Sequence, residues 1–151
     1  MPAIPSRMGK LKMADFLTKT QRSQRMAAIK GKANEKTELR LKSLFNRYGI
    51  TGWRRHYPIT GRPDFVFLKL KIAIFVDGCF WHSCPKHSHI PRSNTTFWKQ
   101  KFLRNRTRDR RVTVELRRSG WKVLRIWEHE LARKNEALVL QRIIRLINKI
   151  E

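Results

Sequence analysis

Two short apolar runs in the middle of the chain constrain the fold more than any other feature. They are Asp64-Phe-Val-Phe-Leu68 and Ile72-Ala-Ile-Phe-Val76. Both are too short for buried helices, and both are rich in β-branched and aromatic residues, which is typical of core strands. We expect the two strands to lie side by side, with Asp64 opening one and Asp77 following the other. Because an unpaired carboxylate beside a core is costly, something must compensate these two acids.

The two carboxylates allow two interpretations. Neighbouring strands can bring Asp64 and Asp77 to one edge of a sheet, where a cation such as Mg²⁺ neutralises them and brings phosphate with it. Alternatively, Asp64 forms an ion pair with Arg62 or another of the many cations. The pairing of the strands favours the metal. Glu38 lies early in a predicted helix, where a structural role at the helix N-terminus is as compatible with its position as catalysis.

Helices and one further strand are predicted around these runs. One helix runs from Thr37 to a glycine end at Gly49, a second covers Thr95 to Arg118, and a strand follows from Trp121 to Trp127. A closing helix is indicated by Leu138, Ile143, Ile144, Leu146, Ile147 and Ile150. We therefore expect a single α/β domain over residues 20–151. The preceding basic tail, residues 1–19, is expected to be disordered until a partner binds.

The charge of the chain indicates a polyanionic partner. Its 35 Lys and Arg residues outnumber 11 Asp and Glu residues, which gives a formal charge of +24. DNA or RNA is the leading partner for such an excess, ahead of a membrane surface. No apolar run approaches the roughly 20 residues that cross a bilayer, and residues 1–13 lack the apolar core of a signal peptide. We expect a soluble, cytoplasmic protein.

The loop after the second apolar run gathers thiols and imidazoles. Its cysteines, Cys79 and Cys84, suit a metal site better than a disulfide framework. His87 or His89 can add an imidazole, and a structural zinc tetrahedron needs a fourth ligand. His129, beyond the last strand, is the best remaining histidine. The alternative is a pair of buried free thiols with histidines on the surface.

His82 and several aromatic residues lie in or near the same loop. His82 is either a further zinc ligand or an imidazole that takes a proton from water attacking a phosphodiester. Phe80, Trp81, Phe97 and Trp98 are either core residues or rings that insert between base steps and kink a duplex. We expect Phe97 to belong to the core. Both tryptophans fit either interpretation, and their proximity to the loop favours exposure.

A series of short motifs runs through the chain in a fixed order. The motifs are Arg22 to Ile29, Thr37-Glu-Leu39, Gly61-Arg-Pro-Asp-Phe-Val66, Asp77-Gly-Cys-Phe-Trp-His82 with Cys84-Pro85, Phe97-Trp98, Arg108-Asp-Arg-Arg111, and Gly120-Trp121 to Trp127-Glu128. Each motif alone is weak, but the series is specific. Together, from about Thr20 to Leu131, they resemble the very-short-patch-repair (Vsr) DNA mismatch endonucleases.

This resemblance implies a restriction-endonuclease-like fold, with a central mixed β-sheet flanked by helices. It also implies an enzyme that nicks one strand of double-stranded DNA next to a T:G mismatch, the product of 5-methylcytosine deamination. Catalytic Mg²⁺ would be bound by Asp64 with help from the main chain of Val76. Asp77 and Glu38 would orient metal-bound waters, and His82 would be the general base.

Further roles follow from the same resemblance. Structural Zn²⁺ is assigned to Cys79, Cys84, His87 and His129, with His89 as the reserve for His87, and DNA intercalation is assigned to Phe80, Trp81 and Trp98. The resemblance implies a bacterial, nucleoid-associated enzyme. We expect a monomer, with mismatch-repair proteins as candidate partners.

Two departures and two rival functions accompany the resemblance. Some relatives carry histidine where this chain has Asp77, so its role as a water organiser is an inference. The lysine that restriction enzymes commonly place on the second strand is missing, and His82 can fill that role. A homing or restriction-type site-specific nuclease would share the fold and the metal. A non-catalytic zinc-stapled DNA-binding module would tolerate loss of Asp64.

Overall fold

The structure is a computed structural model that describes residues 18–149, except for the side chains of residues 30–34. Its described elements are α1 Lys19–Arg47, β1 Arg54–Arg55, β2 Phe65–Phe67, β3 Ile72–Asp77, α2 Thr95–Arg118, β4 Lys122–Trp127, the 3-10 helices η2 Glu128–Leu131 and η3 Arg133–Asn135, and α3 Glu136–Asn148. The chain divides into two compact units, one ending at Lys32 and one beginning at Ala33. The second unit holds the whole sheet.

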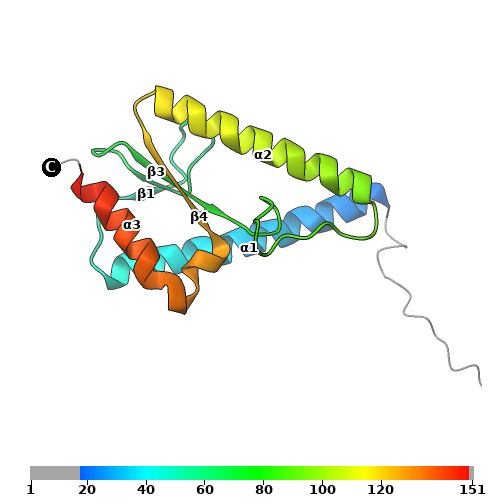
Figure 1. The fold of residues 1–151 in the computed structure, drawn as a ribbon, viewed down its shortest axis with the longest axis horizontal. Helices are drawn as coiled ribbons and strands as arrows, with labels where there is room; N and C mark the ends of the chain where they lie inside the picture. The colour runs from blue at the N-terminus through cyan, green and yellow to red at the C-terminus, as the bar shows by residue number, and fades with distance from the viewer. Residues whose placement is uncertain (1–17, 150–151) are drawn as a thin grey trace, which may run out of the picture. The chain divides into compact units, whose positions relative to one another are not determined.

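This sheet is mixed and four-stranded, in the order β1-β2-β3-β4 (Figure 1). β2 and β3 pair antiparallel, with Phe65 opposite Ile74, which confirms the two adjacent core strands expected from the sequence. β3 and β4 pair parallel, with Asp77 opposite Trp127. The start of β2 and the ends of β3 and β4 therefore meet at one edge of the sheet. Asp64 and Asp77 lie at that edge.

Helices cover both faces of the sheet. Successive side chains of a strand point to opposite faces, and two buried clusters result. The first cluster joins strand residues to the C-terminal part of α1 and to α3, and consists of Leu41, Leu44, Phe45, Phe65, Phe67, Ile72, Ile74, Val76, Ile126, Leu131, Val139 and Ile143. The second joins Val66, Ala73 and Phe75 to Val112 and Leu116 of α2. Figure 1 shows α2 on the opposite side of the sheet from α3. Burial on both faces explains why the two strands are continuously apolar.

The first helix is longer than the sequence indicates. α1 begins at Lys19 instead of Thr37. Glu38 therefore lies inside the helix, and its interpretation as a helix N-terminal residue is wrong. The end of the helix is as predicted, because Gly49 has a φ of 65°, the left-handed conformation in which glycine commonly terminates helices. Residues 1–17 of the predicted disordered tail lie outside the described residues.

The predicted apolar helix faces are only partly buried. α2 spans Thr95–Arg118, the range expected from the sequence. Leu138 and Ile144 of α3 are exposed, so the assignment of these two residues to a buried stripe is wrong. Ile150 lies outside the described residues. Within the range that the structure covers, no helix is long and apolar enough to cross a membrane.

Candidate active site and metal centre

Asp64 and Asp77 lie at the same edge of the sheet, as expected. Asp64 Oδ2 accepts a hydrogen bond of 2.7 Å from the main-chain N–H of Val76. The alternative ion pair with Arg62 is not formed among the described residues. Burial raises the pKa of Asp64 to about 7; the Val76 hydrogen bond opposes this rise, and the charges of Glu38 and Asp77 add to it. Carboxylates that are crowded in this way suit a bound cation.

Glu38 reaches the same place from α1 and is only 7% exposed. Its Oε2 accepts a hydrogen bond of 2.6 Å from Arg55 Nη2 and lies 3.0 Å from His56 Nε2. One ligand atom each of Glu38, His56 and Asp64 lies within 4.8 Å of the other two. His56 was not predicted to belong to this cluster. Its place depends on the pairing of β1 with β2, and a strand of 2 residues leaves no periodic pattern.

Asp77 has an arginine partner that sequence analysis missed. Arg125 Nη1 lies 2.9 Å from Asp77 Oδ1 and 3.1 Å from Oδ2. Arg125 also donates from Nε to Thr113 Oγ1 at 3.0 Å and from Nη2 to the main-chain carbonyl of Asp109 at 3.2 Å. Burial raises the pKa of Asp77, while the charges of His82 and Arg125 oppose the rise. Asp77 is thus a buried carboxylate whose charge is partly compensated.

His82 lies between two carboxylates. Its Nδ1 is 2.6 Å from Asp109 Oδ2 and 3.7 Å from Asp77 Oδ1. Burial acts to raise the pKa of Asp109, but the hydrogen bond and charge of His82, with Arg125 and Arg108, outweigh burial and lower it. An ionised Asp109 that accepts from Nδ1–H fixes the orientation of the imidazole and leaves Nε2 for proton transfer. The sequence shows Asp109 in an arginine-rich motif, but its contact with His82 depends on how α2 packs.

A second cluster brings together Cys79, Cys84, His87 and His129, with one ligand atom of each within 4.8 Å of the others. His129 Nδ1 lies 3.3 Å from Cys79 Sγ and 3.5 Å from Cys84 Sγ. His87 Nδ1 lies 3.8 Å from Cys84 Sγ. Burial raises the pKa of Cys79 to about 11. Two sulfur and two imidazole donors match the ligand set of a tetrahedral structural zinc site, so this cluster is compatible with a metal.

The aromatic rings around the loop pack against one another. The ring centroid of Phe80 lies 5.1 Å from that of Trp81 and 5.3 Å from that of Trp98. Trp81 is 6% exposed and Trp98 9%, whereas Phe97 is 47% exposed. The expected exposure of the two tryptophans is therefore wrong for the protein without DNA, and the expected burial of Phe97 is wrong as well. His89, the reserve zinc ligand, lies beside Phe80 at 6.0 Å and outside the cysteine–histidine cluster.

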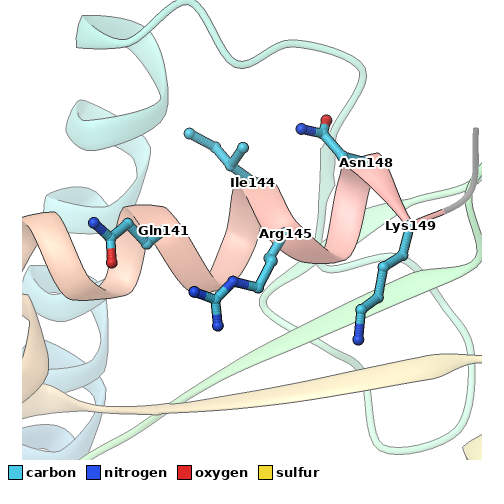
Figure 2. A pocket seen from close by; sticks show the side chains of 5 residues that line it. All are labelled: Gln141, Ile144, Arg145, Asn148 and Lys149. Atoms are coloured by element: carbon cyan, nitrogen blue, oxygen red, sulfur yellow. The ribbon is translucent and has the colours of Figure 1, made fainter.

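A separate surface hollow lies along the last turns of α3 (Figure 2). It is lined by Gln141, Ile144, Arg145, Asn148 and Lys149. Figure 2 shows the first four side chains on this helix and Lys149 on the residue that follows it. This hollow contains no carboxylate, thiol or imidazole, so it has none of the chemistry of the two clusters.

Comparison with known proteins gives a consistent result. The family profile described as "DNA mismatch endonuclease Vsr" matches residues 14–88, a range that includes Glu38, Asp64, Asp77 and His82. The type II nicking enzyme V.NmeAIP of Neisseria meningitidis is 40% identical over 141 residues, covering 92% of this chain and 98% of that protein.

Two further relatives extend this comparison. The DNA mismatch endonuclease Vsr of Escherichia coli is 39% identical over 121 residues, which cover 77% of this chain and 74% of that enzyme. The type II nicking enzyme V.NaeI of Lentzea aerocolonigenes is 52% identical over 69 residues, which cover 46% of this chain and 42% of that enzyme. The similarities to V.NmeAIP and to the Escherichia coli enzyme extend across most of both sequences.

Proposed function

The chain belongs to the Vsr family of DNA mismatch endonucleases and is a DNA-nicking enzyme, and we propose that it cuts one strand next to a T:G mismatch in a Mg²⁺-dependent reaction. One observation carries the proposal: the carboxylates of Asp64 and Glu38 meet at the edge of the sheet that also holds the His82–Asp109 pair. The mixed sheet with helices on both faces supports a restriction-endonuclease-like fold. The bacterial relatives support action at the nucleoid in the cytoplasm.

The residues at this edge fit a hard divalent cation. Asp64 would hold Mg²⁺ with the main chain of Val76, and Glu38 and Asp77 would orient its waters. The raised pKa of Asp64, which comes from burial and from neighbouring carboxylates, supports a site that needs positive charge. When bound, Mg²⁺ supplies charge that stabilises the phosphate oxygens in the transition state.

The protein's own contribution to proton transfer lies in His82. With Nδ1 held 2.6 Å from Asp109 Oδ2, the Nε2 lone pair can accept a proton from the water that attacks the phosphodiester. Asp109 keeps the imidazole in the required tautomer and stabilises it once it is protonated. Arg125 joins Asp77 to the main chain of Asp109. It thereby holds the carboxylates of Asp77 and Asp109 in position around His82.

The cysteine–histidine cluster would hold structural Zn²⁺ through Cys79, Cys84, His87 and His129. His129 follows β4 within η2, so a zinc ion there would tie the loop after β3 to the end of β4. His82 belongs to that same loop. We assign the zinc a structural role in bracing the loop that carries the general base.

Recognition of the mismatch is assigned to Phe80, Trp81 and Trp98. Rings inserted between base steps unstack and kink DNA, and a wobble pair such as T:G offers less resistance to this deformation than a matched pair. Because both tryptophans are buried without DNA, insertion requires the aromatic cluster to open on binding. The energy for opening comes from phosphate contacts of this strongly basic chain.

A nicking assay tests the proposal. Full-length protein is incubated with end-labelled T:G, matched and other mismatched duplexes in Mg²⁺ or in EDTA. We expect one strand of the T:G duplex to be cut, only with Mg²⁺. Asp64→Ala and His82→Ala should abolish cutting and retain binding to the T:G duplex, and His82→Ala should retain its zinc. Unchanged cutting by Asp64→Ala would overturn the assignment of the active site.

Sequence-specific nicking of matched DNA is the second candidate. It is favoured by the names of two relatives, which are called type II nicking enzymes. The same assay separates the candidates, because equal cutting of matched and T:G duplexes at one sequence would favour this alternative. Preference for the T:G duplex would exclude it.

A further inference from the structure

His56 occupies an unusual backbone conformation next to Asp64. It follows β1 directly, its main-chain N–H donates to the Asp64 carbonyl at 3.3 Å, and its φ is 49°. A positive φ is uncommon for a residue with a side chain, although His, Asn and Asp adopt it more readily than most. Such outliers persist where the surroundings enforce them and are enriched at functional sites.

The imidazole of His56 points into the carboxylate cluster. Its Nε2 lies 3.0 Å from Glu38 Oε2, and one ligand atom each of Glu38, His56 and Asp64 lies within 4.8 Å of the others. The His56 side chain is 54% exposed, whereas that of Glu38 is 9% exposed. This arrangement has buried oxygen donors on one side and an open imidazole on the other. Catalytic metal sites have this form, with protein ligands at the base and open positions for water and substrate.

An ion pair with Glu38 alone explains His56 poorly. The same carboxylate oxygen, Glu38 Oε2, already accepts a hydrogen bond of 2.6 Å from Arg55 Nη2, so Glu38 has a permanent cation without His56. Asp64, by contrast, has no arginine or lysine partner among the described residues. A metal bound by His56 and Asp64 would supply the missing charge.

We propose that His56 is a direct ligand of the active-site metal, together with Asp64 and beside Glu38, and that its imidazole lets this site accept a first-row transition metal such as Mn²⁺ as well as Mg²⁺. The inference rests on the proposed metal-dependent function and names the class of metal. Mg²⁺ prefers oxygen ligands in near-octahedral geometry. An imidazole nitrogen adds little for Mg²⁺ but binds transition metals well, while carboxylates also suit Mn²⁺.

Mn²⁺ binding to the full-length protein tests the role of His56. One equivalent of Zn²⁺ is added first, so that the cysteine–histidine cluster is filled. Free Mn²⁺ is then measured by electron paramagnetic resonance during a titration, and pulsed spectra report whether a nitrogen nucleus couples to the bound ion. His56→Asn is the test variant, because asparagine tolerates a positive φ. His89→Asn is the matched control, since His89 belongs to neither ligand cluster.

Wild-type protein and the His89→Asn variant should show nitrogen coupling and equal Mn²⁺ affinity. His56→Asn should lose the coupling and bind Mn²⁺ about tenfold more weakly, while its Mg²⁺ affinity changes less. His56→Asp, which supplies an oxygen donor, should move the preference toward Mg²⁺. Retained nitrogen coupling and unchanged Mn²⁺ affinity in His56→Asn would overturn the inference.

Asp64→Asn separates this inference from the proposed function. It should lose Mn²⁺ binding and Mg²⁺-dependent nicking together, and persistent nitrogen-coupled Mn²⁺ in this variant would place the ion elsewhere and overturn the role of His56. If Asp64→Asn nicks DNA at the wild-type rate, the proposed active site fails. If Asp64→Asn is inactive but His56→Asn binds Mn²⁺ normally, only the role of His56 fails.

Discussion

Arg125 on β4 binds Asp77 at the end of the neighbouring strand β3, with Nη1 at 2.9 Å from Oδ1 and 3.1 Å from Oδ2. The guanidinium carbon also lies 4.3 Å from the centroid of the Phe75 ring. Through Thr113 and the carbonyl of Asp109, Arg125 ties the sheet edge to α2. One arginine therefore compensates a buried carboxylate and positions the partner of His82.

Arg125→Met should destabilise the fold in a pH-dependent way. Removing the partner of a largely buried carboxylate costs about 3 kcal/mol of unfolding free energy, and methionine retains part of the aliphatic packing. Burial raises the pKa of Asp77 in the folded protein above its ordinary value. The ionised form of Asp77 therefore destabilises the folded state at pH values above the unfolded-state pKa. This destabilisation is lost as the pH falls through the folded-state pKa and Asp77 becomes protonated. The loss should therefore be larger at about pH 8 than at about pH 5, measured by urea unfolding.

Arg47→Met is the matched control for that experiment. Arg47 Nη1 forms a similar pair with Glu136, at 3.0 Å from Oε1, but its side chain is 53% exposed. Exposed pairs contribute at most about 1 kcal/mol, so little loss is expected. Equal losses for Arg125→Met at both pH values would contradict the account of Asp77 as a compensated buried charge.

Asp109→Asn should separate catalysis from binding. The amide cannot hold the His82 imidazole in the tautomer that an ionised carboxylate selects, so the general base loses its orientation. We expect kcat for nicking of the T:G duplex to fall by about 10²-fold, with KM and duplex affinity unchanged. Glu115→Gln makes the same acid-to-amide change on the same helix at an exposed site and should behave as wild type. A change in KM alone would show that Asp109 acts in binding.

Zinc binding should release protons. Burial raises the pKa of Cys79 to about 11, so this thiol is protonated at neutral pH and must ionise to bind the metal. Calorimetric titration of zinc-free protein in buffers of different ionisation enthalpy should show release of at least one proton per zinc bound. Cys79→Ser should lower both the zinc affinity and the proton release, and His89→Asn should change neither. Zinc binding without proton release would mean that Cys79 is not a ligand.

Short-range patterns predicted the central strands and α2 well. β2, β3 and α2 each carry their own periodic or compositional signal, and a hairpin of two short strands with acids at its open end brings Asp64 and Asp77 together by geometry alone. The cysteine–histidine cluster could be predicted because its ligand types are rare in the chain. The start of α1 could not be predicted, because the residues before Thr37 have no sustained apolar period that would indicate a helix there.

Contacts between elements distant in sequence were missed. Arg125 meets Asp77 because β3 and β4 pair in parallel, and the register of a parallel pair leaves no local trace in the sequence. Asp109 meets His82 because of the rotation of α2 about its axis. The rotation of α2 also determines which aromatic residue is buried. Phe97 and Trp98 are neighbours in sequence, but successive side chains of a helix point about 100° apart, so burying one exposes the other.

The exposure of Phe97 leads to a last prediction. Phe97 is 47% exposed and Trp98 9%, and Lys101 Nζ lies 5.7 Å from the centroid of the Phe97 ring. Trp98→Ala should lower the unfolding free energy by about 3–5 kcal/mol, whereas Phe97→Ala should leave it nearly unchanged.

An exposed ring beside a cation is suited to stacking on DNA bases, so Phe97→Ala should weaken duplex binding by about 1 kcal/mol. Leu103, 58% exposed on the same helix, provides the control, because Leu103→Ala removes apolar surface without a ring; equal effects of both variants on binding would show that Phe97 does not stack.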